Sequence, residues 1–220
     1  MTAWDELKVV LVRLRDEQPG VLMGYPMPEV DEGRVPPFGI RLAPWAAATA
    51  AELHRRFGDD VELTVGALPY PPGARPRPRL AAAPLPGLLD SREVTVDLDG
   101  PAVVRSGHTL RHGLLVRNLS GSELQIATNG GVIAVVVDPH TGEVVGGYSG
   151  AQAMPLQVFR VAPGGSTRIP LLIATASTMP GLGYMLPAGE WGIQVTLTLG
   201  PHPSDSPRRR TPILPLTVIA

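Results

Sequence analysis

Hydrophobic positions in the first 65 residues switch between helical and strand spacing. Three- and four-residue intervals predict an amphipathic helix over residues 2–18. Its apolar positions are Trp4, Leu7, Leu11 and Leu14. Apolar residues at alternate positions predict short strands at 38–42 and 61–65. Between them, helical spacing predicts a helix that opens at Pro44 and ends at Gly58. A strand, a helix and a strand in this order predict a parallel pair, which the first helix can cover.

Beyond residue 88 the helical spacing disappears, and short alternating segments recur between turn residues. Eight strands are expected, at 93–98, 109–118, 123–128, 132–138, 156–161, 167–174, 191–199 and 212–219. Residues 138–142 and 163–166 combine proline or aspartate with glycine, which is typical of hairpin turns. Regular short strands without helices between them predict an all-β sandwich of the immunoglobulin type.

Proline concentrates between these two regions. Seven prolines lie between residues 69 and 86, interleaved with Arg75, Arg77 and Arg79. This composition predicts a semi-rigid linker, and the alternative is a docking peptide for a proline-recognition module or an acidic surface. The fold class is therefore expected to be α+β overall. Residues 1–68 form a small α/β (α-β-α-β) domain, 69–88 the Pro/Arg-rich linker and 89–220 the immunoglobulin-like sandwich.

Composition narrows the classes of partner. The 220 residues are 44% hydrophobic, with a formal net charge of −1 and no cysteine. A charge near zero argues against nucleic acid or an anionic membrane as partner, and the lack of cysteine excludes disulfides and thiolate ligands. The amino terminus shows no cationic stretch leading into an apolar one, and every apolar run is shorter than a membrane span. A bacterial, cytoplasmic protein is expected.

The order of turns in the second half resembles a known family. The stretches that carry the resemblance are Val-Arg-Asn-Leu-Ser at 116–120, Val-Val-Val-Asp at 135–138, Gly-Glu-Val-Val at 142–145, Pro-Gly-Gly-Ser at 163–166 and Pro-Ala-Gly-Glu-Trp at 187–191. They resemble bacterial immunoglobulin-like domains, and among these the intracellular proteinase inhibitor family of bacilli. The resemblance covers residues 93–220 and implies a β-sandwich with inhibitory activity. Where that family often has tyrosine, Trp191 is expected to make the corner hydrogen bond through its indole N–H.

Several motifs resemble catalytic or metal-binding sites, but the secondary structure predicted around each of them does not allow that chemistry. His108 and His112 lie where the local pattern is strand, one in a loop and one on the strand at 109–118, and about 13 Å separates positions four apart in a strand, too far for one ion. Gly-Tyr-Ser-Gly-Ala at 147–151 lacks the helix that a nucleophile elbow needs, because Pro155 follows closely. Arg208–Arg210 is expected to be a solvated hairpin loop. No catalytic residue, metal ligand or cofactor is predicted.

Apolar residues in expected loops are the candidates for binding. They are Tyr148, Met154, Met179, Leu182, Tyr184 and Met185. Methionine and tyrosine are frequent in binding surfaces, although a small satellite core under the loops is an equal alternative. The leading hypothesis is a non-enzymatic protein-interaction or scaffold module that binds another protein. The alternatives are a proteinase inhibitor acting through an exposed sandwich loop, and an enzyme or small-ligand binder with a site between the domains.

Overall fold

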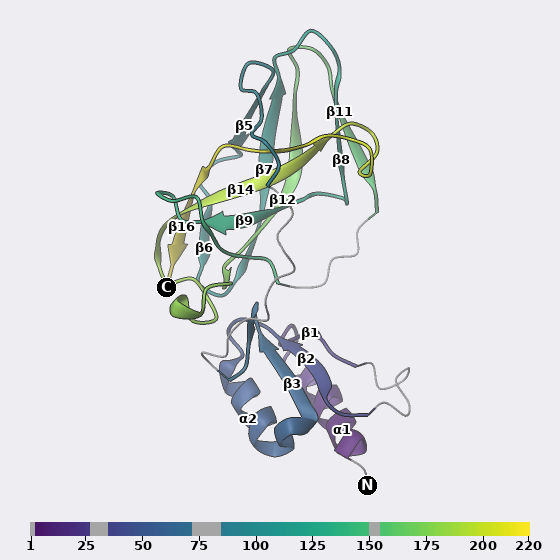
Figure 1. Ribbon diagram of the computed structural model, residues 1–220, viewed down its shortest axis with the longest axis vertical. Helices are drawn as coiled ribbons and strands as arrows, with labels where there is room; N and C mark the ends of the chain where they lie inside the picture. Colours follow the sequence, from purple (N-terminus) through teal and green to yellow (C-terminus); the bar gives the residue numbers. More distant parts are fainter. Residues whose placement is uncertain (1–2, 27–34, 72–84, 150–154) are drawn as a thin grey trace.

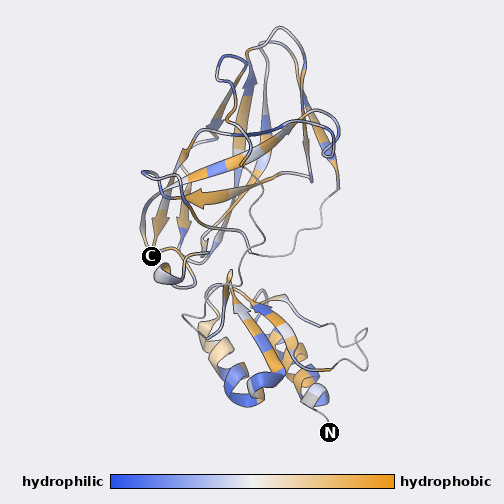
Figure 2. Ribbon diagram, in the orientation of Figure 1, coloured by the Kyte–Doolittle hydropathy of each residue, from blue (hydrophilic) through white to orange (hydrophobic). Residues whose placement is uncertain are grey.

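A computed structural model describes residues 3–26, 35–71, 85–149 and 155–220 of the chain (Figure 1). Strands hold more of the described residues than helices do, and they form a small sheet near the amino terminus and a large curled sheet in the second half. Each sheet has its own cluster of buried apolar side chains. Figure 2 shows that the apolar stretches follow the strands, whereas the end of the second helix is polar.

The amino-terminal part contains the helices and strands that the residue spacing predicts. Its elements are α1 (Ala3–Glu17), β1 (Leu22–Gly24), β2 (Phe38–Leu42), α2 (Ala47–Phe57), the 3-10 turn η1 (Gly58–Asp60), β3 (Val61–Val65) and β4 (Leu68–Pro69). The sheet order is β1-β2-β3-β4, and β2 and β3 are parallel as predicted. Strands β1 and β4 were not predicted, and α2 begins at Ala47 and not at Pro44, which lies in the turn before it.

One face of this small sheet is packed and the other is exposed. Residues of β2 and β3 alternate between buried and exposed positions. The buried set, which includes Phe38 and Ile40, belongs to the same cluster as Leu7 and Leu11 of α1 and Leu53 of α2. Both helices therefore supply the apolar stripe that covers the packed face.

The second half is a β-sandwich. Its longer strands are β5 (Val94–Leu98), β7 (Thr109–Asn118), β8 (Leu124–Thr128), β9 (Val132–Val137), β11 (Gln157–Val161), β12 (Ser166–Ala174), β14 (Gly189–Leu199) and β16 (Leu214–Ile219). Strands β5, β7 and β12 pair on one side of the sandwich core and β9, β14 and β16 on the other, and β9 joins the two sides because it also pairs with β12. Strand β14 continues beyond this layer to pair with β8, which pairs with β11. All eight predicted strands are present.

Short strands complete the sandwich, and the sequence pattern missed them. They are β6 (Val103–Arg105), β10 (Val144–Gly147), β13 (Ala176–Ser177) and β15 (Arg208–Arg210), with the 3-10 turn η2 (Pro180–Leu182). The expectation that Arg208–Arg210 forms a solvated loop is wrong, because β15 pairs with β14. The Arg210 guanidinium also donates to the Pro86 carbonyl at 2.8 Å and to Gln194 Oε1 at 3.1 Å.

Buried polar side chains join the sandwich strands. Asn118 is completely buried at the end of β7, where its amide nitrogen donates to the carbonyls of Ser122 and Val161 at 2.7 and 2.9 Å. Gln194 is a polar residue in the middle of β14, yet it is only 7% exposed. Its side chain can be buried because both ends of the amide are hydrogen-bonded. The amide nitrogen donates to the Thr211 carbonyl at 2.8 Å, and the Arg210 guanidinium donates to the amide oxygen.

Predicted turns and the predicted corner bond have the expected geometry. Asp138 Oδ1 accepts the backbone N–H groups of His140 and Thr141 at 2.8 and 2.9 Å, and Gly142 has φ 71°. The Trp191 indole N–H donates to the Pro187 carbonyl at 3.1 Å. These bonds fix the direction in which the chain enters the next strand.

Both ends of the proline-rich segment belong to described structure. Tyr70 donates its backbone N–H to the Leu63 carbonyl, and Leu89 donates to the Arg210 carbonyl. Residues 72–84, which hold most of the predicted linker, lie outside the described residues. The division of the chain into domains at 68 and 89 stays a prediction.

Candidate functional site

The amino-terminal part meets the sandwich along a contact that we call the seam. On one side it contains Arg41, Pro44, Trp45 and Gly66; on the other it contains Gly107, His108, Ser149 and Tyr184. Pro44, Trp45 and Gly66 follow the carboxyl ends of the parallel strands β2 and β3, where ligands commonly bind in open α/β sheets. Figure 1 shows these strand ends directed toward the sandwich.

Close contacts define the geometry of the seam. The rings of Trp45 and His108 pack edge to face with centroids 5.2 Å apart, and the Arg41 guanidinium donates to the Ser149 carbonyl at 3.0 Å. Gly66 has φ 60°, and a Cβ added there would lie 3.1 Å from the Tyr184 carbonyl oxygen. Glycine is therefore needed at this position both for its backbone conformation and for the approach of the loop.

A cavity of about 210 Å³ lies in the seam. Its lining residues are Gly20, Met23, Pro44, Trp45, Gly107, His108, Thr109, Tyr148, Ser149, Ala174 and Ala176. The walls are mostly apolar, with the His108 ring, the Thr109 hydroxyl and Ser149 as polar groups. The volume is below the range of about 300–1,000 Å³ for sites that enclose drug-sized ligands, so the cavity suits a single side chain or ring.

Five of the six predicted binding residues lie in described parts of the chain, and they divide into four environments. Tyr148 lines the seam cavity. Met179 and Leu182 pack against the sandwich core, as a satellite core would. Tyr184 packs against the amino-terminal core, and Met185 is 40% exposed. Met154 lies outside the described residues.

The sequence pattern did not predict which residues of the amino-terminal part line the seam cavity. Trp45, at 47% exposed, stands in the turn after β2, and Met23 belongs to β1. Both line the cavity beside Tyr148, although about a hundred residues separate them from it. The signal in the sequence was a tryptophan directly after proline at a strand end, a place where core residues are not expected.

The Tyr184 hydroxyl is buried at the seam without a hydrogen-bond partner among the described residues. Burial raises the pKa of this hydroxyl above its ordinary value, and the neighbouring Tyr70 adds to the shift. The hydroxyl is therefore neutral at physiological pH, and its O–H remains available as a hydrogen-bond donor.

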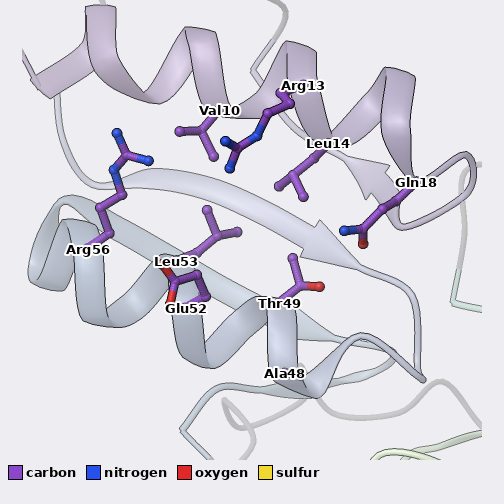
Figure 3. A pocket seen from close by; sticks show the side chains of 9 residues that line it. All are labelled: Val10, Arg13, Leu14, Gln18, Ala48, Thr49, Glu52, Leu53 and Arg56. Atoms are coloured by element: carbon purple, nitrogen blue, oxygen red, sulfur yellow. The ribbon is translucent and has the colours of Figure 1, made fainter.

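A second cavity, of about 280 Å³, lies between α1 and α2 (Figure 3). Val10, Leu14 and Leu53 form its floor, and Figure 3 shows Arg13 and Arg56 reaching over it from opposite helices. The floor side chains are only 2–7% exposed, so little apolar surface is open to a ligand. Arg56 is paired with Glu6 across the groove, which makes the rim part of the packing between the helices.

Groups that could suggest catalysis are dispersed. Asp138 is occupied by its own turn, where the backbone N–H groups of Thr141 and His140 hold its pKa below the ordinary value. His112 approaches the Pro101 carbonyl at 3.3 Å through Nε2, while His108 contacts Trp45. Within the described ranges, no group of three or more His, Asp or Glu side chains is arranged to hold a metal ion.

No helix in the described part of the chain is long and apolar enough to cross a membrane.

The comparisons with known proteins identify no family for this chain, so its fold is assigned from the topology of its strands. No family model and no curated protein matches the sequence. Among solved structures, the chain is similar to the CARDB domain of a Pyrococcus furiosus protein in complex with di-metal ions (14% identity, TM-score 0.30, 58% of this chain and 88% of that one).

Two larger proteins contain similar regions. One is the native α2-macroglobulin of Escherichia coli (19% identity, TM-score 0.31, 58% of this chain and 7% of that one). The other is β-glucosidase from Listeria innocua in complex with glucose (13% identity, TM-score 0.33, 58% of this chain and 16% of that one). This chain thus spans only a small part of these two proteins, and likenesses of this size carry no inference about its activity.

Proposed function

We propose that this protein is a non-enzymatic interaction module, built on an immunoglobulin-like β-sandwich, that binds another protein at the seam. The observation that carries this proposal is the convergence of Met23, Trp45 and Tyr148 around one cavity. These side chains come from three segments far apart in the sequence, and they are of the types that binding surfaces favour.

The exposure of two large apolar side chains supports the seam as the binding surface. Trp45 is 47% exposed and Met185 is 40% exposed, and the Met185 sulfur lies beside Gly107 of the cavity wall. A large aromatic ring that is half open to solvent next to a preformed hollow is the arrangement found at interface hot spots. Isolated exposed leucines and valines elsewhere on the chain need no such explanation.

The experiment is quantitative affinity capture from native lysate with the full-length chain as bait. Three variants are run in parallel: Trp45→Glu and Met185→Glu at the seam, and Val9→Glu as the matched control on α1, where Val9 is 68% exposed. We expect a stoichiometric partner with wild type and with Val9→Glu, reduced at least about tenfold by either seam variant, since a buried unpaired charge costs more than 1.4 kcal/mol.

Other outcomes of the capture would replace this proposal. A partner that all three variants retain would place the interaction elsewhere on the chain. A protease among the captured proteins, followed by stoichiometric inhibition on titration, would support the inhibitor alternative. Empty lanes with every bait would count against protein binding and favour a small ligand.

A further inference from the structure

The seam cavity has the size and lining of a pocket for one aromatic side chain. Met23, Pro44 and Trp45 supply apolar and aromatic walls on one side, and Ala174 and Ala176 are small residues on the other. Thioether and proline groups pack well against aromatic rings, and the two alanines leave room for a flat group. His108 and Thr109 are polar residues of the wall, and their side chains can meet the edge of a ring or the peptide beside it.

The charges around this cavity are uneven. Arg41 reaches its margin, where the guanidinium donates to the carbonyl of the lining residue Ser149. The carboxylates nearest in sequence to Gly20, Asp16 and Glu17, are paired with arginines of their own helix. Glu62, on the exposed face of the small sheet, has an interaction of its own. Among the residues that the structure describes, no carboxylate belongs to the lining.

From this geometry we infer that the seam cavity is the anchor pocket for an aromatic residue, flanked by an acidic one, in an extended segment of the partner protein. The inference rests on the proposed function and names the chemistry of the partner. The ring enters between Trp45 and Ala174, and the acidic side chain remains outside, toward Arg41. A single ring buried in such a pocket supplies much of the affinity of an interface, and the flanking charge adds orientation.

The test uses the full-length, isotope-labelled chain and blocked tetrapeptides as probes. The peptides are acetyl-Ala-Trp-Glu-Ala-amide, the same peptide with Leu for Trp, and the same peptide with Gln for Glu. Chemical-shift changes of the Gly107 and His108 amides report binding at the seam. We expect the Trp-Glu peptide to bind at least about threefold more tightly than the Leu-Glu peptide, because ring contacts add to the apolar area buried.

Two substitutions separate the pocket from its charge. Thr109→Phe fills the cavity from a position on β7 that is exposed, and Thr95→Phe places the same ring on an exposed position of β5 as the control. We expect Thr109→Phe to abolish the shifts and Thr95→Phe to retain them. Arg41→Gln is expected to remove the advantage of the Glu peptide over the Gln peptide, which is about two- to fivefold at low salt. Arg117→Gln, an exposed arginine on β7, should keep this advantage.

Each negative result refutes one part of the inference. Equal binding of the Trp and Leu peptides, or shifts that persist in Thr109→Phe, would refute the aromatic pocket. An advantage of the Glu peptide that survives in Arg41→Gln would refute the role of the charge. Tighter binding of free indole-3-acetate than of any peptide would make the occupant a small aromatic acid instead. If the captured partner remains bound to Thr109→Phe but not to Trp45→Glu, the proposed function stands and the anchor pocket fails.

Discussion

Asn118 gives the sharpest test of how the sandwich is held together. Its side chain makes four hydrogen bonds: its nitrogen donates to the carbonyls of Ser122 and Val161, and its oxygen accepts from the backbone N–H and the hydroxyl of Ser120. The bond to Val161 is fully buried and joins the end of β7 to the end of β11. Replacement of Asn118 by alanine removes all four bonds at once.

The cost of Asn118→Ala follows from which groups remain buried. Leaving the Val161 carbonyl without a partner costs about 1–3 kcal/mol, because water cannot replace the lost donor. The bonds to Ser120 and Ser122 lie closer to solvent, so together they add about 1–2 kcal/mol. The expected loss in the free energy of unfolding is therefore about 3 kcal/mol, several times the effect of an ordinary surface substitution.

Native-state hydrogen exchange measures this loss in the sandwich alone. The amides of Leu114 and Ile169, in the paired strands β7 and β12, report the opening of the buried core. Asn129→Ala, at an exposed asparagine, is the matched control and should change little. A loss below about 1 kcal/mol in Asn118→Ala would refute the reasoning, because it would mean that water or a rearranged chain satisfies the Val161 carbonyl.

Three further outcomes are expected. Gly192→Ala should destabilise the sandwich by about 1–3 kcal/mol in urea unfolding, because the added Cβ meets the Ile213 side chain and lies 3.0 Å from a methyl of Val137. The loss should shrink in an Ile213→Ala background, and an unchanged loss would contradict this contact. The folded-state pKa of Asp138 is lowered by backbone N–H groups, so its contribution to stability is present above the unfolded pKa of about 3.9 and disappears as pH falls through the lower, folded value. The stability difference between wild type and Asp138→Asn should accordingly vanish in acid, and a difference that persists below both pKa values would refute the assignment. Limited proteolysis should cut first near Arg75–Arg79 and leave a stable fragment that begins near residue 88; a first cut within 110–200 would contradict the predicted domain boundary.

Local periodicity was sufficient to predict most of the secondary structure. The helix over 2–18, the strands at 38–42 and 61–65 and the eight strands of the sandwich have the predicted positions within a few residues. These elements were predictable because each buries one face, so its apolar residues repeat with its own period. Strands β6, β10 and β15 were missed because they are short and owe their existence to pairing with β16, β9 and β14.

The candidate site illustrates the limit of sequence reasoning more clearly. Tyr148, Tyr184 and Met185 could be selected as apolar residues in loops, but nothing in their neighbourhood along the chain indicated Trp45 or Arg41 as their companions. Spacing within one segment cannot specify which distant segment will face it, because that choice depends on the packing of complete surfaces.

The sequence by itself determined the periods of the helices and strands, the turns at 138–142 and 163–166, and the corner bond of Trp191, since all of these depend on residues within a few positions of one another. Only the tertiary structure decided that Arg208–Arg210 forms a strand, that Gln194 is buried, and that a cavity opens between Trp45 and Tyr148. The physical reason is that long-range pairing satisfies backbone groups and covers side chains irrespective of their local pattern.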